Sequence, residues 1–516
     1  MKRFIANHAA CVTGVLSGFD RLVLRGTIRP LAFVDGLKRL LWKRQVLLKN
    51  FGDYAHGLTA QLKEASLAQA EAAGRPVEYL PSSRTSKEDV ARKIARRDGV
   101  ESGLIAVLSS LEPCMSYDIF RNRDAKRLEL VSRPRKGLAL YHYFIDPVFG
   151  FMHARIQTWL PFGIQICLNG REWLAQTMDR AGLGYRRREN CFVAIDNVER
   201  AQWMIDRQLA LAWAPALDRI ARAINPAHGR MFDDFAAEYY WSVHQSEWAT
   251  DVMFRNSSAL AAIYPSLVRH GMTTFSSPDV MRFLGGKVHG AFKGEIISDF
   301  KDRPEGVRIK HRVGQNSVKL YDKQGSVLRV ETTINNPYGM KVFRPREGDA
   351  DGPSSWRPMR KGIADLHRRT RLSQASNDRY LDALASVDTA TPLGGLVRKI
   401  CTPIHWNGKR VRALRPWSQE DTALFQAVNR GEFSINGFRN ADLQTHLYDQ
   451  PAQSPGEKKR RSAKTTRLLR MLRAHGLIRK VQSSHRYVLT AGGRDLIAGV
   501  LTTQRVTLEQ LQTVNA

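Results

Sequence analysis

Four polar residues lie close together near the middle of the chain, namely Lys319, Tyr321, Lys323 and Glu331. A phenol attacks at neutral pH only when a neighbouring base or cation assists its ionisation, and a lysine ammonium supplies such a cation. A carboxylate beside them can bind a hard divalent metal ion. These residue types, brought onto one surface, are suited to chemistry at a phosphate group.

The elements that must position these residues are three short strands predicted over 307–336. Apolar and polar residues alternate in each strand, and turns are predicted at 314–316 and 324–325. Successive residues of a strand point to opposite faces. We therefore expect the two lysines and the tyrosine on one face of the middle strand, and Arg329 and Glu331 together on the last strand.

Length and charge restrict the class of protein. A chain of 516 residues predicts two to four domains, and 43% hydrophobic residues are enough to build their cores. The chain has 80 Lys and Arg against 49 Asp and Glu, a formal net charge of +31. An excess of this size favours a polyanionic partner, with nucleic acid ahead of an anionic membrane surface. No apolar run reaches the roughly 20 residues that a membrane span needs.

The cysteines and the N-terminus indicate the compartment. The five cysteines are odd in number and widely scattered: Cys11, Cys114, Cys167, Cys191 and Cys401. This distribution favours a reducing environment over a disulfide framework or a zinc site. The basic N-terminus precedes a mildly apolar run that His8 and Thr13 interrupt, which argues against a signal peptide. We expect a cytoplasmic protein.

The chain is predicted to be a mixed α/β, or α+β, multidomain protein. Residues 1–135 alternate strands with helices, and residues 136–224 form an aromatic-rich β/α region. Residues 225–400 are the candidate catalytic region, largely helical over 225–305 and followed by the antiparallel β-meander. Residues 410–516 form a separate C-terminal domain.

The C-terminal pattern is helix, helix, helix, hairpin, helix. Ser418 begins the first helix, the second ends near Tyr448, and a basic loop over 456–461 leads into a third helix over 463–475. A hairpin over 478–489 and a closing helix follow. This order resembles the winged-helix DNA-binding fold, in which the third helix enters the major groove.

A dense group of basic residues occupies the third helix and the hairpin of this domain. We expect phosphate contacts from its members: Lys458, Lys459, Arg460, Arg461, Lys464, Arg467, Arg470, Arg473, Lys480, His485 and Arg486. DNA is the expected ligand and RNA the alternative. A winged helix used for protein contacts is a further alternative.

A second resemblance concerns the strand that ends in an aliphatic residue followed by Tyr-Asp-Lys, then a turn and an Arg-x-Glu strand. It resembles the replication initiation factors of some rolling-circle plasmids and phages, over about 30 residues of the chain. The resemblance implies that Tyr321 attacks a DNA phosphodiester with Lys323 as its partner. It also implies that Glu331, with Asp322, binds Mg²⁺ or Mn²⁺. Members often carry a Glu soon after the Lys, where this chain has Gln324.

Several other residues are candidates for the same site. His311 is a candidate base, and His289 and Glu295 are candidate metal ligands. The resulting hypothesis is a DNA-binding protein of a mobile element or replicon, with a metal-dependent nicking and joining activity. A water-using nuclease built on Glu295, Asp299 and Glu331 is an alternative.

A non-enzymatic DNA- or RNA-binding protein is the other alternative. In that case the meander is a basic docking surface, and Lys319 forms a cross-strand salt bridge with Arg329 and Glu331. The same contacts would then stabilise the sheet without taking part in a reaction.

Overall fold

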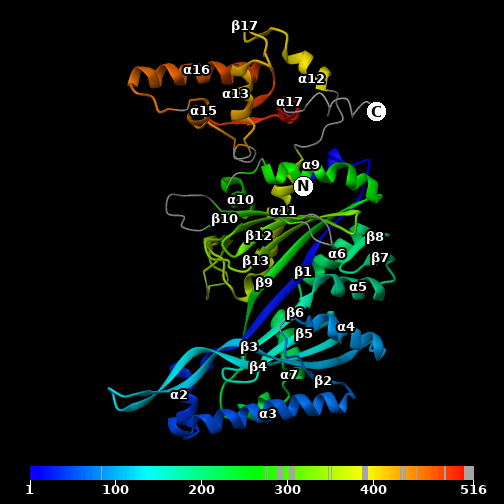
Figure 1. Ribbon diagram of the computed structural model, residues 1–516, viewed down its shortest axis with the longest axis vertical. Coiled ribbons are helices and arrows are strands. Elements are labelled where there is room, and N and C mark those ends of the chain that lie inside the picture. Colours follow the sequence, from blue (N-terminus) through cyan, green and yellow to red (C-terminus); the bar gives the residue numbers. More distant parts are fainter. Residues whose placement is uncertain are drawn as a thin grey trace. The chain divides into compact units, whose positions relative to one another are not determined.

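The computed structural model describes the chain except for these residues: 83, 274, 276, 287–294, 302–307, 347, 350, 386–392, 431–432, 434–436, 449, 482–483 and 505–516. Figure 1 shows the ribbon of the chain coloured along the sequence. Backbone contacts divide the chain into two compact units. Unit 1 comprises Met1–Gly14, Asp251–Thr332 and Gln374–Ala516, and unit 2 comprises Val15–Thr250 and Thr333–Ser373.

The chain belongs to the mixed α/β class, as predicted, and is built on a large mixed sheet. Eleven strands follow the order β10-β11-β12-β13-β9-β1-β6-β5-β4-β3-β2. They are β1 (Val12–Ile28), β2 (Val77–Tyr79), β3 (Gly103–Asn122), β4 (Arg127–Asp146), β5 (Gly150–Gln157), β6 (Ile164–Asn169), β9 (Tyr239–Phe254), β10 (Ile296–Lys301), β11 (Arg308–Val313), β12 (Asn316–Lys323) and β13 (Val327–Ile334). The pairing of β2 with β3 is parallel, and β3 pairs antiparallel with β4 along its whole length.

The predicted meander is present in unit 1 as β11, β12 and β13. Gly314 turns the chain between β11 and β12 with a φ of 56°. Between β12 and β13, Gln324 and Gly325 have φ values of 60° and 75°, the backbone of a tight hairpin turn. Every residue of β13 is buried, as expected of a strand inside a sheet that is covered on both faces.

Three helices of unit 1 contact this meander. They are α9 (Ser257–Thr273), α10 (Ser277–Phe283) and α11 (Leu366–Leu384), whose first part belongs to unit 2. Ile309 of β11, Phe283 and Tyr380 are fully buried there. Helix α1 (Lys2–Asn7) contacts α11, where the backbone of Arg3 donates a hydrogen bond to Asp382.

Unit 2 alternates strands with helices over residues 15–135, as predicted. Ser86 accepts a hydrogen bond from the backbone of Asp89 and begins its helix. The helices are α2 (Val34–Lys43), α3 (Phe51–Ala72), α4 (Lys87–Arg97), α5 (Gly170–Arg180), α6 (Val198–Gln208), α7 (Trp213–Ile224) and α8 (His228–Met231). In the described residues of unit 2, two hairpins lie outside the large sheet: β7 (Tyr185–Arg188) with β8 (Cys191–Ile195), and β14 (Lys341–Arg344) with β15 (Ser355–Pro358).

The prediction that residues 225–305 are largely helical was wrong for its middle part. Residues Tyr239–Phe254 form the strand β9, which lies between β13 and β1 in the sheet. Trp241 and Val243 are buried in this strand, and the segment is rich in aromatic and β-branched residues. These residue types favour a strand that is buried in a sheet over a helix.

The C-terminal elements of unit 1 from residue 419 on follow one another in the predicted order. They are α13 (Gln419–Val428), α15 (Asn440–Leu447), α16 (Pro455–Ala474), β18 (Ile478–Lys480), β19 (Tyr487–Leu489) and α17 (Ala491–Thr503). They are preceded by α12 (Leu393–Ile400), β16 (Ile404–Trp406) and β17 (Lys409–Val411). Leu424, Phe425, Leu472 and Ile497 are at the centre of their shared core.

The predicted basic loop over 456–461 is helical, which corrects the sequence interpretation. Ser454 accepts a hydrogen bond from the backbone of Glu457, and Pro455 occupies the first helical position. An N-cap serine followed by proline is a strong start signal, so α16 begins before the basic run.

Candidate functional site

Tyr321 and Glu331 meet on neighbouring strands of unit 1. The phenol of Tyr321 on β12 donates a hydrogen bond of 2.7 Å to Glu331 Oε2 on β13. Lys319 Nζ lies 2.5 Å from the other carboxylate oxygen of Glu331. Lys319 and Tyr321 share a face because they are two residues apart on one strand, as the alternation predicted.

The Glu331 carboxylate is buried yet ionised. Only 2% of its side chain is exposed, and this burial on its own raises the pKa. The charge of Lys319 and the hydrogen bonds from Lys319 and Tyr321 outweigh burial, so the pKa of Glu331 lies below its ordinary value. An anionic carboxylate in this position can accept the phenolic proton.

A second buried ion pair lies beside the first. Arg329 precedes Glu331 by two residues on β13 and forms a bidentate pair with Asp251 of β9, at 2.5 and 2.8 Å. Each side chain is 1% exposed. Two parallel hydrogen bonds fix the orientation of the guanidinium. The positive charge of Arg329 also helps to lower the pKa of Glu331.

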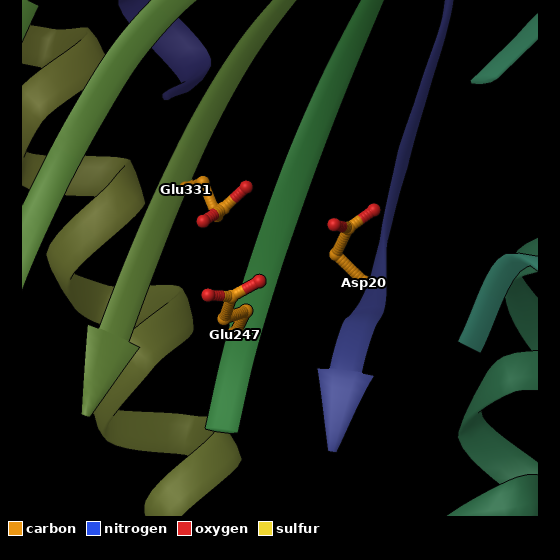
Figure 2. A group of neighbouring side chains, drawn as sticks. All are labelled: Asp20, Glu247 and Glu331. Carbon is orange, nitrogen blue, oxygen red and sulfur yellow. The ribbon is translucent and has the colours of Figure 1, made fainter. Parts of the chain in front are cut away.

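Among the described residues, three carboxylates are close enough together to share one metal ion. Asp20 of β1, Glu247 of β9 and Glu331 each offer an oxygen, and these oxygens lie within 4.8 Å of one another. Figure 2 shows the side chains on the three neighbouring strands. Sequence reasoning did not identify Asp20 or Glu247, because Glu247 lay in a segment interpreted as helix and the pairing of the strands was unknown.

The donor set of this cluster fits a hard cation. Three carboxylate oxygens are typical ligands of Mg²⁺ or Mn²⁺, and like charges this close repel one another unless a cation neutralises them. Two contacts in the cluster compete with a metal. Lys319 already neutralises part of the Glu331 charge, and Asn190 donates a hydrogen bond of 2.7 Å to Asp20.

The other predicted residues of β12 lie on either side of Tyr321. Lys323 is two residues away and therefore on the same face, although Lys319 is the lysine that contacts Glu331 at 2.5 Å. Asp322 points to the opposite face and is half-buried, and burial raises its pKa. Among the described carboxylates, Asp322 is not part of the cluster around Glu331.

His311 is buried in a separate part of unit 1. Its Nδ1 lies 2.7 Å from Ser298 Oγ, and its Nε2 lies 3.0 Å from the hydroxyl of Tyr380. Burial lowers the pKa of His311 to about 4, so the imidazole is neutral at physiological pH. Both ring nitrogens have neutral partners, which indicates a role in holding β10, β11 and α11 together.

The two remaining candidates do not join the cluster. Glu295 is exposed immediately before β10, and its backbone carbonyl accepts a hydrogen bond from Gly314. His289 lies in the segment 287–294, outside the described residues.

The predicted nucleic-acid contacts lie on α16 and on the hairpin that follows it. The exposed members are Lys458, Lys459, Arg460, Lys464, Arg467, Arg470, Lys480 and His485. Lys459, Arg467 and Arg470 are spaced by eight and three residues and therefore share one face of the helix. In the described part of the chain, no salt bridge engages these three.

Other members of the group have protein partners. Arg461 pairs with Glu457 and lies over the Tyr448 ring, with 4.6 Å from the guanidinium carbon to the ring centroid. Lys464 lies 3.0 Å from Glu420. Arg473 lies over Trp406, and Arg486 donates a hydrogen bond to the Gly437 carbonyl. These contacts stabilise the helix and the hairpin, and the same side chains contribute positive charge.

The fold and the contacts therefore define a basic, mixed α/β protein in whose large sheet a tyrosine and a lysine contact one buried carboxylate. No known family model, curated protein or solved structure matches the chain. In the described residues, every helix is too short or too polar to span a bilayer.

Proposed function

We propose that the chain is a cytoplasmic DNA-binding protein of a mobile element or replicon, which nicks and rejoins DNA through Tyr321. The hydrogen bond between the Tyr321 phenol and the buried Glu331 carboxylate carries this proposal. A tyrosine held against an anionic acceptor, on a strongly basic protein, has the nucleophile, the proton acceptor and the affinity for phosphate that the reaction needs.

In the proposed reaction the Tyr321 oxygen attacks a phosphodiester phosphorus, and the phenolic proton passes to Glu331. The bond between phosphorus and the 3′ oxygen breaks, and that oxygen leaves with the electron pair and takes a proton from water. The products are a free 3′ hydroxyl and a 5′-phosphotyrosine. Attack by the 3′ hydroxyl on the phosphotyrosine reverses these steps and rejoins the strand.

Asp20, Glu247 and Glu331 would hold Mg²⁺ or Mn²⁺ in this proposal. A bound divalent ion would stabilise the charge on the phosphate oxygens in the transition state. Lys319 keeps the Glu331 carboxylate ionised, and Arg329 adds positive charge beside it. Lys323, on the same face as Tyr321, would approach the phosphate.

The C-terminal part of unit 1 would deliver the DNA. We assign α13, α15, α16 and the β18–β19 hairpin to a winged helix, with α16 as the recognition helix. The exposed basic residues of α16 and the order of the elements support this assignment. Duplex DNA is favoured over RNA because the deep, narrow major groove of an RNA duplex does not admit a helix.

Capture of a covalent adduct on supercoiled plasmid tests the proposal. The plasmid should carry the DNA that flanks the gene, and the reaction should contain Mn²⁺ or Mg²⁺. We expect a nicked circle with the protein attached to a 5′ end, and its loss in Tyr321→Phe. Tyr79→Phe is the matched control, since Tyr79 is an exposed tyrosine of unit 2.

A water-using, metal-dependent nuclease is the second candidate. The cluster of Asp20, Glu247 and Glu331 favours it, because three carboxylates can activate water without a tyrosine. Two of the three acids first predicted for this role lie outside the cluster: Asp299 pairs with Arg312 at 3.1 Å, and Glu295 is exposed. Metal-dependent cleavage without an adduct, unchanged in Tyr321→Phe, would favour this candidate.

A further inference from the structure

The β14–β15 hairpin of unit 2 presents two aromatic rings to solvent. Phe343 and Trp356 are directly opposite in the register of the hairpin, and their ring centroids are 5.8 Å apart. They are 58% and 69% exposed. On the other face of the hairpin, Val342 is buried against Met340 and Met359. The hairpin is therefore anchored by one face while the other holds exposed rings.

A buried carboxylate fixes the base of this hairpin. Asp365 is 1% exposed and forms salt bridges with Arg360 at 3.1 Å and with Arg344 of β14 at 3.6 Å. Arg344 also donates a hydrogen bond to the carbonyl of Pro358 in β15. Burial opposes ionisation of Asp365, but hydrogen bonds from Arg360 hold its pKa below the ordinary value. The hairpin is thus held in place by charged contacts as well as by its apolar face.

Exposed positive charge continues from the end of this hairpin. Lys361 follows β15 by three residues, and its carbonyl accepts a hydrogen bond of 2.7 Å from the Val243 backbone in β9. His244, the next residue of β9, has its pKa lowered by burial and then by the charges of Arg25, Lys361 and Arg369. Three positive side chains therefore act on His244, and two of them, Arg25 and Lys361, are exposed.

Arg29 lies near Lys361, because Arg29 contacts the Tyr240 ring and the Tyr240 hydroxyl lies beside Gly362. It follows β1, and its guanidinium carbon lies 3.6 Å from the ring centroid of Tyr240, which is 40% exposed. Within the described residues, Arg25, Arg29 and Lys361 are all exposed and none of them is in a salt bridge. Side chains that carry charge into solvent without a protein counterion are available to phosphates.

We infer that this surface of unit 2, with Phe343 and Trp356 as its aromatic part and Arg25, Arg29 and Lys361 as its basic part, binds single-stranded nucleic acid. Exposed rings accept unstacked bases, and the neighbouring cations follow the backbone. The bases of a duplex are already stacked on one another, so only a melted or single strand can use the rings. The inference rests on the proposed function only for the choice of DNA over RNA.

Fluorescence anisotropy with a labelled oligothymidylate tests this inference on the full-length protein. Trp356→Ala should weaken binding about tenfold, because this is the usual loss when the aromatic side chain under a stacked base is removed. Trp42→Ala is the matched control, because Trp42 on α2 is 83% exposed in the same unit. Arg25→Ala should lower the slope of log affinity against log salt by about 0.7, whereas Arg39→Ala on α2 should not.

Duplex DNA separates this surface from the proposed winged helix. Trp356→Ala should leave duplex binding unchanged, and charge reversal on α16 should weaken duplex binding far more than oligothymidylate binding. Equal oligothymidylate affinity in Trp356→Ala and the wild type would overturn the inference, as would stronger binding to anionic vesicles than to oligothymidylate. Unchanged nicking in Tyr321→Phe, with normal oligothymidylate binding that Trp356→Ala weakens, would contradict the proposed function and leave this surface in place.

Discussion

Tyr321 and Glu331 are joined by a hydrogen bond of 2.7 Å between strands β12 and β13. The second oxygen of the same carboxylate lies 2.5 Å from Lys319 Nζ. One buried carboxylate therefore receives a phenol and an ammonium from alternate positions of the neighbouring strand. This arrangement orients the phenol and gives its proton an acceptor, and it stabilises the sheet at the same time. The two roles predict different outcomes for substitutions.

Removal of the phenolic oxygen should abolish covalent chemistry and leave binding intact. In Tyr321→Phe we expect no 5′-linked protein–DNA adduct, because the ring remains but the attacking atom is gone. Adduct formation is followed on denaturing gels with labelled plasmid, and duplex affinity by anisotropy. An adduct of normal yield in Tyr321→Phe would contradict the assignment of the nucleophile.

Neutralisation of Glu331 should lower stability in a way that depends on pH. Glu331→Gln leaves the nearly buried Lys319 without its counterion, which should reduce the free energy of unfolding by about 3 kcal/mol at neutral pH. The folded-state pKa is depressed, so the contribution of Glu331 is present above its unfolded value of 4.5 and is lost as the pH falls through the folded value. Urea unfolding at neutral and at acidic pH should show the difference between variant and wild type shrinking in acid.

A double variant distinguishes the ion pair from a wider disruption. Lys319→Met combined with Glu331→Gln removes both charges and should recover much of the lost stability, because a buried pair can be replaced by uncharged groups at little cost. A double variant as unstable as the sum of the two single variants would show that the pair is not coupled.

The sequence predicted the meander and the face of β12 because both follow from local alternation and turn residues. Gln324 and Gly325 adopt the backbone that their types allow, and Tyr321 and Lys319 lie on the expected side. The resemblance implied Lys323 as the partner of Tyr321, and a cross-strand contact of Lys319 with Glu331 was considered as the alternative. Alternation alone cannot decide between two lysines on one face, because the register with β13 depends on the whole sheet.

Local sequence patterns could not predict that the acids of the cluster lie close together. Asp20 and Glu331 are more than 300 positions apart in the sequence, and their proximity depends on the order β13-β9-β1. Glu247 lies in a segment that was interpreted as a helix because of its aromatic and acidic residues. The segment is a central strand because it pairs with β13 and β1, which are far away in the sequence. Tertiary context of this kind overrides local preference.

His311 should prove structural. Its folded pKa is about 4 and the ordinary value is 6.5, so the unfolded chain binds a proton more readily between these values. Stability should therefore fall as the pH drops from 6.5 towards 4, by up to about 3 kcal/mol from this residue. In His311→Gln that part of the pH dependence should disappear, as measured by urea unfolding across this range. A nicking rate in the folded variant that collapses at neutral pH would instead support the predicted catalytic role.

The exposed face of α16 should determine duplex affinity. Arg467→Glu and Arg470→Glu should each weaken duplex binding and lower the slope of log affinity against log salt by about one, as expected for a lost phosphate contact. Arg39→Glu on α2 carries the same charge change on another exposed helix and serves as the control. An equal fall of the slope in the control would show that the effect comes from the net charge of the protein and not from phosphate contacts of α16.

Asp20 and Glu247 should control the metal dependence of the reaction. Asp20→Asn and Glu247→Gln keep the shape of each side chain while removing a charge, so the two carboxylates that remain bind a divalent ion more weakly. We expect nicking to need a higher Mn²⁺ concentration in each variant, and EDTA to abolish nicking in the wild type. The variants should also be more stable than the wild type without metal, because the repulsion among the three carboxylates is relieved. Thermal unfolding with and without Mn²⁺ measures both effects. A wild type that Mn²⁺ does not stabilise, with nicking unchanged in both variants, would show that the cluster holds no catalytic metal.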